Sequence, residues 1–298
     1  MQSLLLLLFL PFTYGAIHSV IMAGSSGYIN YRHHADTCHA YHLLRDSNVD
    51  PANIITMLYD DVADDPQNPF PGRLFNTPSN KTNPGVDVYQ GTKKDYVGEA
   101  VTAANFLAVL SGDQSKVPPG HPVLRSGAND RVFISFFDHG GPGILGTPVG
   151  PYITREALLD TLDTMFRKKM YKELVFYVEA CEAGSMFTGM PTDINIYVVA
   201  AANSSQSSWG DYCPDNDWVY YNNTYKEINS CLGDTFSNMW MANLQKFLFQ
   251  NETLLQQFKR VKQETTKSNV STYGDFLFDN ETIHNFERRL TSVDNCLS

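Results

Sequence analysis

Charged residues and long apolar runs are both scarce in this sequence. Only 18% of its 298 residues are charged, and 22 Lys and Arg against 32 Asp and Glu give a formal net charge of −10. A surface of that sign does not attract a phosphate backbone or an anionic membrane, so nucleic-acid binding is excluded as a main function. Internal repeats and low-complexity tracts are also absent, which argues against solenoids and fibres.

The single long apolar run lies at the N-terminus, where residues 4–10 are all Leu or Phe. It is shorter than the ~20 helical residues that span a bilayer, but it has the length of a signal-peptide core. Thr13 and Gly15 are small residues that fit cleavage before Ala16, so residues 1–15 are expected to be a signal peptide. A buried first strand is the alternative. No later apolar stretch reaches spanning length, so we expect no membrane segment in the mature chain.

The remaining residues, 16–298, predict one domain, because 43% of the sequence is hydrophobic and can form one large core. Runs that are apolar on both faces, as buried parallel strands require, occur at 19–23, 54–59, 132–137, 174–179 and 195–200. Helical patterns occur at 35–45, 102–110, 154–169 and about 234–267, while 60–96 and 111–129 are expected to be loops. This order predicts an α/β fold with a mostly parallel sheet between helices.

Two of the predicted strands end in reactive side chains. His139 follows the strand at 132–137, and Cys181 follows the strand at 174–179. Ligands of open parallel sheets bind at the carboxyl ends of the strands, and adjacent strands are ~5 Å apart, so these side chains can meet. A thiolate, an imidazole and nearby glycine amides are the parts of a cysteine hydrolase. Each residue taken alone is more often structural than catalytic.

Six ordered segments carry a wider resemblance. They read Gly-Tyr-Ile-Asn-Tyr-Arg-His-His-Ala-Asp at 27–36, Met-Leu-Tyr-Asp-Asp at 57–61, Asp-Val-Tyr-Gln-Gly at 87–91, Asp-His-Gly at 138–140, Glu-Ala-Cys-Glu-Ala-Gly-Ser-Met at 179–186 and Cys-Leu-Gly-Asp at 231–234. From about His18 to Tyr273 the chain resembles the legumain family of asparaginyl endopeptidases. The resemblance implies a caspase-like α/β/α sandwich and a cysteine endopeptidase without a cofactor. Its substrates would be proteins and peptides, cleaved after Asn and, at acid pH, after Asp.

The resemblance also implies roles for individual residues. Cys181 would be the nucleophile and His139 its acid/base partner, with Asn30 orienting the imidazole. The backbone amides of Gly140 and Cys181 would form the oxyanion hole. The pocket for the substrate Asn, whose carboxamide suits a guanidinium and carboxylates, maps onto Arg32, Glu179, Ser208 and Asp234. Asp138 matches the family position associated with succinimide formation and ligation, although a carboxylate bonded to loop amides is an equal alternative.

Cysteines and glycosylation sequons add further expectations. Cys213 and Cys231 flank a polar, aromatic segment and are expected to form a disulfide, Cys38 is expected to be buried, and Cys296 is unassigned. Sequons fit a chain in the secretory pathway, bound for a lysosome- or vacuole-like acidic compartment or for secretion. Glycans are expected at Asn80, Asn222, Asn251, Asn269 and Asn280. A sixth sequon, at Asn203, is set aside because the resemblance places it close to the pocket.

The sequence also departs from the family. Gly141 stands where many relatives have Ser, and the chain stops about where the family's catalytic domain ends, so the C-terminal prodomain is expected to be absent. By resemblance, we expect cystatin-type protein inhibitors and a monomer. No metal site is expected, because only some members of a His- and Cys-rich stretch share a helix face. That stretch contains His33, His34, Asp36, Cys38, His39 and His42.

Two other functions are weighed against the endopeptidase. A transamidase of the lipid-anchor-attaching type usually carries a membrane-spanning tail and lacks the full pocket. A non-catalytic binding relative would be expected to lose Asn30, His139 or Cys181, and all three are present. The residues leave open whether water or an amine resolves the thioester, and therefore whether hydrolysis or peptide ligation follows.

Overall fold

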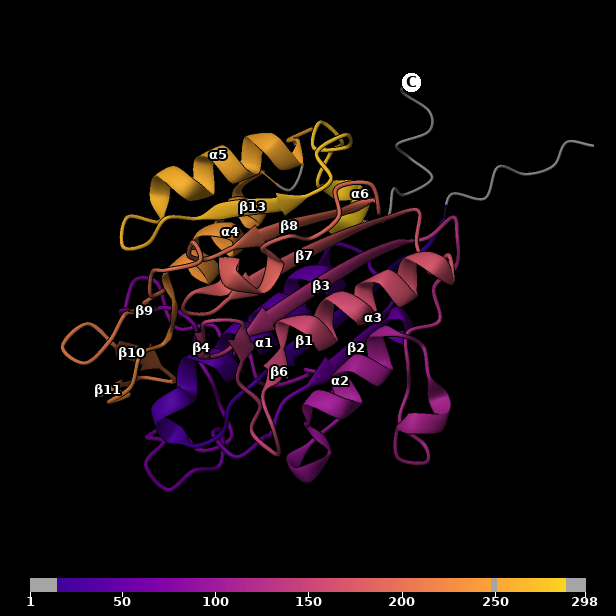
Figure 1. Ribbon diagram of the computed structural model, residues 1–298. Helices are drawn as coiled ribbons and strands as arrows, with labels where there is room; N and C mark the ends of the chain where they lie inside the picture. Colours follow the sequence, from indigo (N-terminus) through magenta and orange to yellow (C-terminus); the bar gives the residue numbers. More distant parts are fainter. Residues whose placement is uncertain (1–14, 248–250, 288–298) are drawn as a thin grey trace, which may run out of the picture.

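A six-stranded sheet forms the centre of the computed structural model, which describes residues 15–247 and 251–287 (Figure 1). The strand order is β13-β8-β7-β3-β1-β2. Five strands are parallel, namely β1 (Ile17–Ala23), β2 (Ile54–Met57), β3 (Arg131–Phe137), β7 (Glu173–Glu179) and β8 (Ile196–Ala200), whereas β13 (Ser271–Gly274) is an antiparallel edge strand. The parallel strands end on one edge of the sheet, and the loops that follow them meet there.

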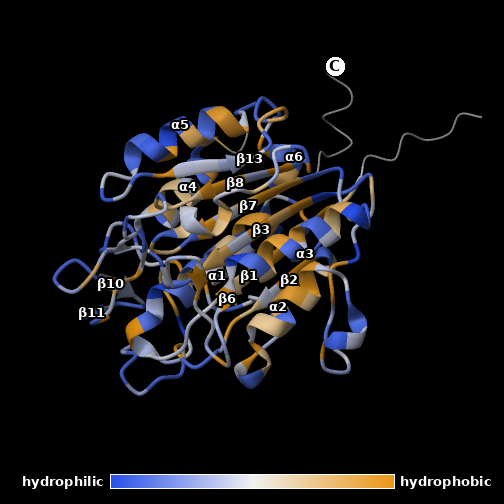
Figure 2. Cartoon of the chain, viewed as in Figure 1, coloured by the Kyte–Doolittle hydropathy of each residue, from blue (hydrophilic) through white to orange (hydrophobic). Residues whose placement is uncertain are grey.

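Helices cover both faces of this sheet. The helices α2 (Ala103–Leu110) and α3 (Arg155–Arg167) pack on one face; on the other lie α1 (Tyr31–Asp46), α4 (Thr235–Phe247), α5 (Leu254–Glu264) and the short α6 (His284–Glu287) (Figure 1). Successive strand residues point to opposite faces, so Ile134 joins one core cluster and Phe133 the other. Because the strands are buried on both faces, they are continuous apolar runs, as the hydropathy colours of Figure 2 show.

The predicted fold class is confirmed, and each of the five predicted strands is present. Helix α1 begins at Tyr31 and not at residue 35, because the 3₁₀ turn η1 (Tyr28–Asn30) leads directly into it. The predicted helical region at 234–267 is divided into α4 and α5, and the Thr253 side chain caps α5 by accepting the Gln256 N–H. The sequence does not predict β13, whose four residues form no apolar run.

Short elements build the surroundings of the carboxyl edge. After β3 come β4 (Gly140–Gly141), β5 (Ile144–Leu145) and β6 (Ile153–Thr154), and after β7 comes η5 (Ala183–Phe187). Strand β9 (Gly210–Asp211) pairs with β12 (Gly233–Asp234), and the segment between them contains the hairpin of β10 (Trp218–Tyr221) and β11 (Thr224–Glu227). The disulfide between Cys213 and Cys231, as predicted, closes this segment at its base. The remaining 3₁₀ turns are η2 (Pro51–Asn53), η3 (Gly98–Ala100) and η4 (Gln114–Lys116).

Several expectations concern the surface or the chain ends. The five sequons expected to carry glycans have exposed Asn residues, whereas Asn203 is half-buried; glycosylation itself stays a prediction. The proposed signal peptide, apart from Gly15, and Cys296 lie outside the described residues. Within the described part of the chain, none of the helices has the length and apolar character needed to cross a membrane.

Candidate active site

The loops after β3 and β7 place His139 and Cys181 at the same edge of the sheet. The two strands are neighbours, as the sequence predicts, and Phe137 of β3 is paired with Glu179 of β7. Gly140 lies directly against the backbone after the second strand, since a Cβ atom at residue 140 would be 2.4 Å from the Cys181 carbonyl oxygen. Only glycine allows this approach, so the Asp-His-Gly segment and the cysteine loop are packed backbone to backbone.

An asparagine holds the histidine ring from the start of α1. The distance from His139 Nε2 to Asn30 Oδ1 is 2.8 Å, and Asn30 Nδ2 donates to the Ser26 carbonyl, also at 2.8 Å. Because the Ser26 carbonyl fixes the orientation of the amide, Asn30 Oδ1 can only accept, and Nε2 of His139 is the donor. Burial, and then the charge of Arg32, lowers the pKa of His139, which favours a neutral ring with an unprotonated Nδ1.

Cys181 is half-buried and lies under a neighbouring loop. Its Sγ is 3.6 Å from the Ser208 carbonyl oxygen, and it is not in a disulfide. The next residue, Glu182, has a φ of 53°, a left-handed conformation that turns the chain sharply into η5. Among the described residues the other free cysteine is Cys38, where burial raises the pKa to about 12 and keeps the thiol protonated.

The four predicted pocket residues come from separate elements and lie near one another. Arg32, in the first turn of α1, donates from Nε to Asp234 Oδ1 at 2.9 Å. Glu179, the last residue of β7, accepts through Oε2 from the Ser237 N–H at 3.0 Å and from its hydroxyl at 2.9 Å. Ser208 lies close enough to Glu179 to lower its pKa, although no hydrogen bond of good geometry reaches Glu179 Oε1.

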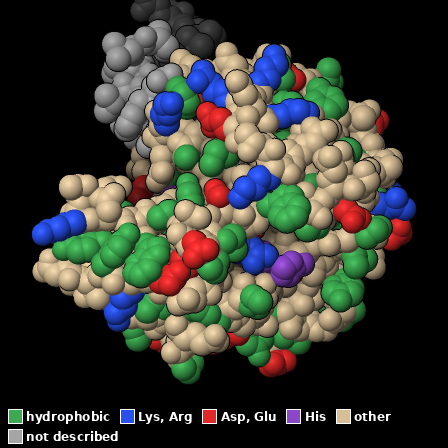
Figure 3. Space-filling view, turned by 90° about the vertical axis from the view of Figure 1, so that its left-hand side faces the viewer, with side chains coloured by type: hydrophobic (Ala, Val, Ile, Leu, Met, Phe, Trp, Pro, Cys, Tyr) green, Lys and Arg blue, Asp and Glu red, His purple; other side chains and the backbone are tan. Residues whose placement is uncertain are grey.

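Two carboxylate oxygens in this pocket are buried and lack a hydrogen-bond partner. Glu179 Oε1 and Asp234 Oδ2 accept no hydrogen bond from any described residue. Burial raises the pKa of both carboxyl groups; the Asp234 charge adds to the rise at Glu179, whereas Arg32 opposes it at Asp234. Unpaired buried acceptors are costly, so the site is suited to a ligand that donates hydrogen bonds. Figure 3 looks onto this end of the molecule, where a histidine side chain is open to solvent next to a basic side chain.

Asp138 is buried behind the histidine. Its carboxyl group is packed between two glycines, since a Cβ atom at Gly24 or Gly146 would come within 2.6 or 1.9 Å of Asp138 Oδ2. Burial raises the pKa of Asp138 to about 7, although the His139 N–H and Arg32 act in the opposite direction. This carboxyl group is therefore largely protonated in mildly acid solution and ionised in alkaline solution.

The roles of three buried side chains are not predicted from the sequence. His33 lies with Nδ1 2.7 Å from Ser25 Oγ and Nε2 3.5 Å from Asp234 Oδ2. Asp36 accepts the Asp234 N–H at 3.1 Å, and Ser237 holds Glu179 as described above. The available signal is spacing: residues 32 and 36 share a helix face, and residue 237 follows residue 234 by three positions.

Three side chains near the proposed catalytic residues also have the donor atoms of a metal site. One ligand atom each from His33, Asp138 and His139 lies within 4.8 Å of the others. Both rings, however, already contribute a nitrogen to the hydrogen bonds with Ser25 and Asn30. We therefore assign no metal to these residues.

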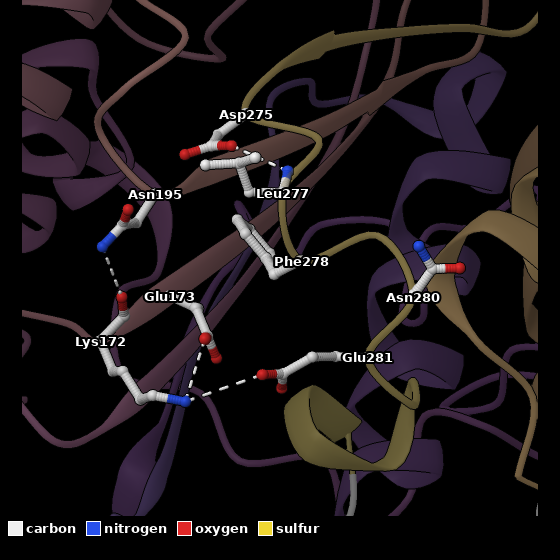
Figure 4. Close-up of a pocket in the computed structure, with 8 residues that line it drawn as sticks. All are labelled: Lys172, Glu173, Asn195, Asp275, Leu277, Phe278, Asn280 and Glu281. Carbon is white, nitrogen blue, oxygen red and sulfur yellow. Dashed lines mark hydrogen bonds and ion pairs between the residues drawn. The ribbon is translucent and has the colours of Figure 1, made fainter.

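A second pocket lies at the opposite end of the strands (Figure 4). It has a volume of about 480 Å³, and it contains ion pairs of Lys172 with Glu173 and Glu281. Neither a thiol nor an imidazole lines it, so it does not have the parts of the cysteine chemistry above. Its lining consists of Lys172, Glu173, Asn195, Asp275, Leu277, Phe278, Asn280 and Glu281.

Comparisons with known proteins agree with the fold. The sequence profile of the peptidase C13 family matches residues 17–289. The vacuolar-processing enzyme beta-isozyme of Arabidopsis thaliana is 47% identical over 262 residues, which cover 87% of this chain and 52% of the relative. Legumain of Canavalia ensiformis is 44% identical, with 87% of this chain and 53% of the relative covered. The chain thus spans about half the length of the curated relatives it matches.

A parallel sheet between two helical layers, with a cysteine and a histidine after adjacent strands, defines a caspase-like α/β/α sandwich. Within that class, the chain belongs to the peptidase C13 family. The resemblance to legumains that the sequence motifs carry is confirmed.

Proposed function

We propose that this chain is a cysteine endopeptidase that cleaves after Asn and, in acid, after Asp. The observation that carries the proposal is the pair of unpaired buried acceptors, Glu179 Oε1 and Asp234 Oδ2, of which Glu179 lies two residues before Cys181. The carboxamide of a substrate Asn donates two N–H groups to these acceptors and offers its carbonyl oxygen to the guanidinium of Arg32. The family and the names of the relatives, vacuolar-processing enzyme and legumain, support a peptidase.

The proposed reaction begins at the thiol. His139 Nδ1 takes the proton of Cys181 Sγ, which attacks the backbone carbonyl carbon of the substrate Asn, while Asn30 keeps the ring oriented. The backbone amides of Gly140 and Cys181 stabilise the oxyanion. His139 then gives its proton to the leaving amine, the C–N bond breaks and a thioester remains. Water, deprotonated by His139, releases the carboxylic acid and restores the thiol, whereas an amine in its place forms a new peptide bond.

The pocket also gives the proposed reaction a pH-dependent specificity. A substrate Asp is charged at neutral pH and is repelled by the negative charge that the pocket carboxyl groups carry in a confined space. Toward its ordinary pKa of ~3.9 it becomes a neutral near-isostere of Asn. Burial raises the pKa of Glu179 to about 8 and also raises that of Asp234, so the pocket carries less negative charge as the solution becomes more acid. Cleavage after Asp should therefore increase relative to Asn as the pH falls toward ~4.

A peptide panel tests this function. Fluorogenic peptides that differ only in the residue before the cut are assayed between about pH 4 and 7, and kcat/KM is compared. We expect Asn to be preferred throughout and Asp to gain on it in acid. A preference for a basic or large apolar residue would show that Arg32, Glu179, Ser208 and Asp234 do not form the specificity pocket.

Ligation and inhibition belong to the same proposal. The neighbouring His139 N–H opposes the rise in the pKa of Asp138, which supports its role as a carboxylate held by loop amides, and succinimide formation stays a prediction. Mass spectrometry of products formed with an added amine nucleophile would measure ligation. Inhibition by cystatin-type proteins and a monomeric state also stay predictions.

We further infer processing and targeting through the secretory pathway. The Ala16 N–H donates to Asp130 Oδ1 at 2.7 Å, so cleavage of residues 1–15 would place the new ammonium group beside a carboxylate. The names of the relatives and the expected acid activity support a vacuole-like compartment. N-terminal sequencing of the secreted or vacuolar protein tests the cleavage point.

A further inference from the structure

The hairpin that follows the proposed catalytic histidine consists largely of glycine. Strand β4 (Gly140–Gly141) pairs with β5 (Ile144–Leu145), and Pro142 and Gly143 form the turn between them. Gly143 has a φ of 70°, a left-handed conformation that favours glycine. The backbone amide proposed for the oxyanion hole, that of Gly140, therefore belongs to a segment with few side chains of its own to hold it in place.

The segment after Cys181, in contrast, is anchored in the core. Two side chains of η5, those of Met186 and Phe187, are buried against the sheet. The backbone is held as well, because the Gly184 N–H donates to the Ala202 carbonyl at 3.1 Å. This short helix is thus a fixed support beside the glycine hairpin of residues 140–145.

The hydroxyl group of Ser185, in the middle of η5, connects the two segments. Its Oγ accepts the Gly143 N–H at 2.8 Å, and the hydroxyl donates to the Gly141 carbonyl at 3.3 Å. Gly143 lies in the turn, outside the paired residues of β4 and β5, so its N–H needs a partner from elsewhere. Ser185 supplies that partner and closes the hairpin onto the segment that carries the thiol.

The turn is also held from its other side. The Arg155 N–H, at the start of α3, donates to the Gly143 carbonyl at 2.9 Å. Gly143 is therefore fixed between α3 and η5, through its carbonyl on one side and its N–H on the other. Of these two bonds, the one to Ser185 is made by a side chain and can be removed by substitution.

We propose that Ser185 is a positioning residue, which holds the glycine hairpin so that the Gly140 amide keeps its place in the oxyanion hole. Negative charge on the substrate oxygen develops in the transition state, so a displaced amide lowers kcat more than it raises KM. This inference rests on the proposed cysteine-peptidase function and names a residue that supports its oxyanion hole.

Three substitutions of Ser185 separate its hydroxyl group from its shape. Ser185→Ala removes both hydrogen bonds, Ser185→Thr keeps the hydroxyl, and Ser185→Val has the shape of Thr without it. Thr188→Ala is the matched control. The Thr188 hydroxyl also donates to a backbone carbonyl, that of Gly184 at 3.4 Å, but this bond stays within its own segment.

The first measurement is kcat and KM on an Asn peptide. Ser185→Ala and Ser185→Val should lower kcat ~10- to 100-fold and leave KM within ~3-fold of the wild type. Ser185→Thr and Thr188→Ala should keep kcat within ~3-fold. A loss that appears in KM alone, or equal kcat values for the Thr and Val variants, overturns the proposal. If Ser185→Ala does not fold, the comparison of Thr with Val decides.

The second measurement examines the thiol without an oxyanion. Iodoacetamide alkylates a thiolate by displacement of iodide, so no tetrahedral oxyanion forms in this reaction. The rate of alkylation of Cys181 should therefore be the same in Ser185→Ala and the wild type. Slower alkylation would place the defect at the thiol and overturn the proposed role in the oxyanion hole.

Hydrogen exchange measures the hairpin without any substrate. The amides of Gly141 and Gly143 should exchange faster in Ser185→Ala than in the wild type or in Thr188→Ala. Equal exchange rates overturn the proposed positioning. Faster exchange in the variant of a protein that cleaves no peptide after Asn defeats the proposed function, while the support of the hairpin stands. A wild type that cleaves after Asn, with an unchanged kcat in Ser185→Ala, defeats this inference alone.

Discussion

The two ends of the parallel strands differ in how their carboxylates are paired with cations. At the amino end, Arg131 and Lys172 lie 2.7 to 3.7 Å from the carboxylates of Glu173 and Glu281, so two cations face two anions. Part of this network lines the pocket in Figure 4. Burial alone would raise the pKa of Glu281, but Arg131, Asn285 and Lys172 together lower it. At this end of the sheet, the positive and negative charges are therefore paired without a ligand.

At the carboxyl end of the strands, the buried charges are not paired in this way. Its carboxyl groups outnumber its cations, their pKa values are raised, and Glu179 Oε1 and Asp234 Oδ2 accept no hydrogen bond of good geometry from the described residues. Uncompensated buried charge of this kind costs stability and is typical of functional sites. Unsatisfied buried polar groups therefore mark the site, and paired charges mark the part of the sheet that needs no ligand.

The largest effect is expected at the thiol. Cys181→Ser should lower kcat/KM on an Asn peptide by ~10³-fold or more, while the free energy of unfolding stays within ~1 kcal/mol, because the change is nearly isosteric. His139→Ala should behave alike, and the double variant should lose little more, since the two act as a unit. Cys38→Ala is the control for the other free thiol. Cleavage by purified Cys181→Ser would refute the assignment of the nucleophile.

The next effect concerns stability against pH. The native pKa of Asp138, about 7, lies above its ordinary value of 3.8. Between these values the native state keeps a proton that the unfolded state has released, so stability falls as the pH rises through this window. The fall is about 1.4 kcal/mol per pH unit and at most about 4 kcal/mol in total. Asp138→Asn should remove it, as urea unfolding at pH 4.5 to 7.5 would show; parallel curves for the two proteins would contradict the raised pKa.

Specificity should change by a smaller amount. Asp234→Asn removes one hydrogen-bond acceptor and one repelling charge. For an Asn peptide, kcat/KM should therefore fall roughly 30-fold, which corresponds to a loss of about 2 kcal/mol in transition-state stabilisation. The ratio of Asp to Asn cleavage at neutral pH should rise. Asp211→Asn, on the paired strand β9 and in an ion pair with Lys267, is the control and should leave the ratio unchanged. Equal ratios in both variants would place the selectivity elsewhere.

The sequence predicts the sheet well because burial on both faces makes each parallel strand a continuous apolar run. It predicts neither β13, a short polar edge strand, nor the start of α1, which is set by a 3₁₀ turn. The family motifs mark Arg32 and Asp234, but their support by Asp36 depends on contacts between residues 198 positions apart. Burial and unpaired acceptors are tertiary properties, and no local pattern contains them.

The smallest effect is expected at the amino end, where Glu281→Gln should cost at most about 1 kcal/mol at pH 7, because its ion pairs with Arg131 and Lys172 are partly exposed. The pKa of Glu281 is lowered, so its contribution is present above its ordinary value of 4.5 and is lost as the pH falls below it, the reverse of Asp138. Urea unfolding of the two proteins should therefore differ at pH 7 and converge in acid, and added salt should reduce the difference. Activity should be unchanged, since this network is at the far end of the strands. A stability difference that grows in acid, or a loss of kcat/KM, would show that the two ends are not electrostatically independent.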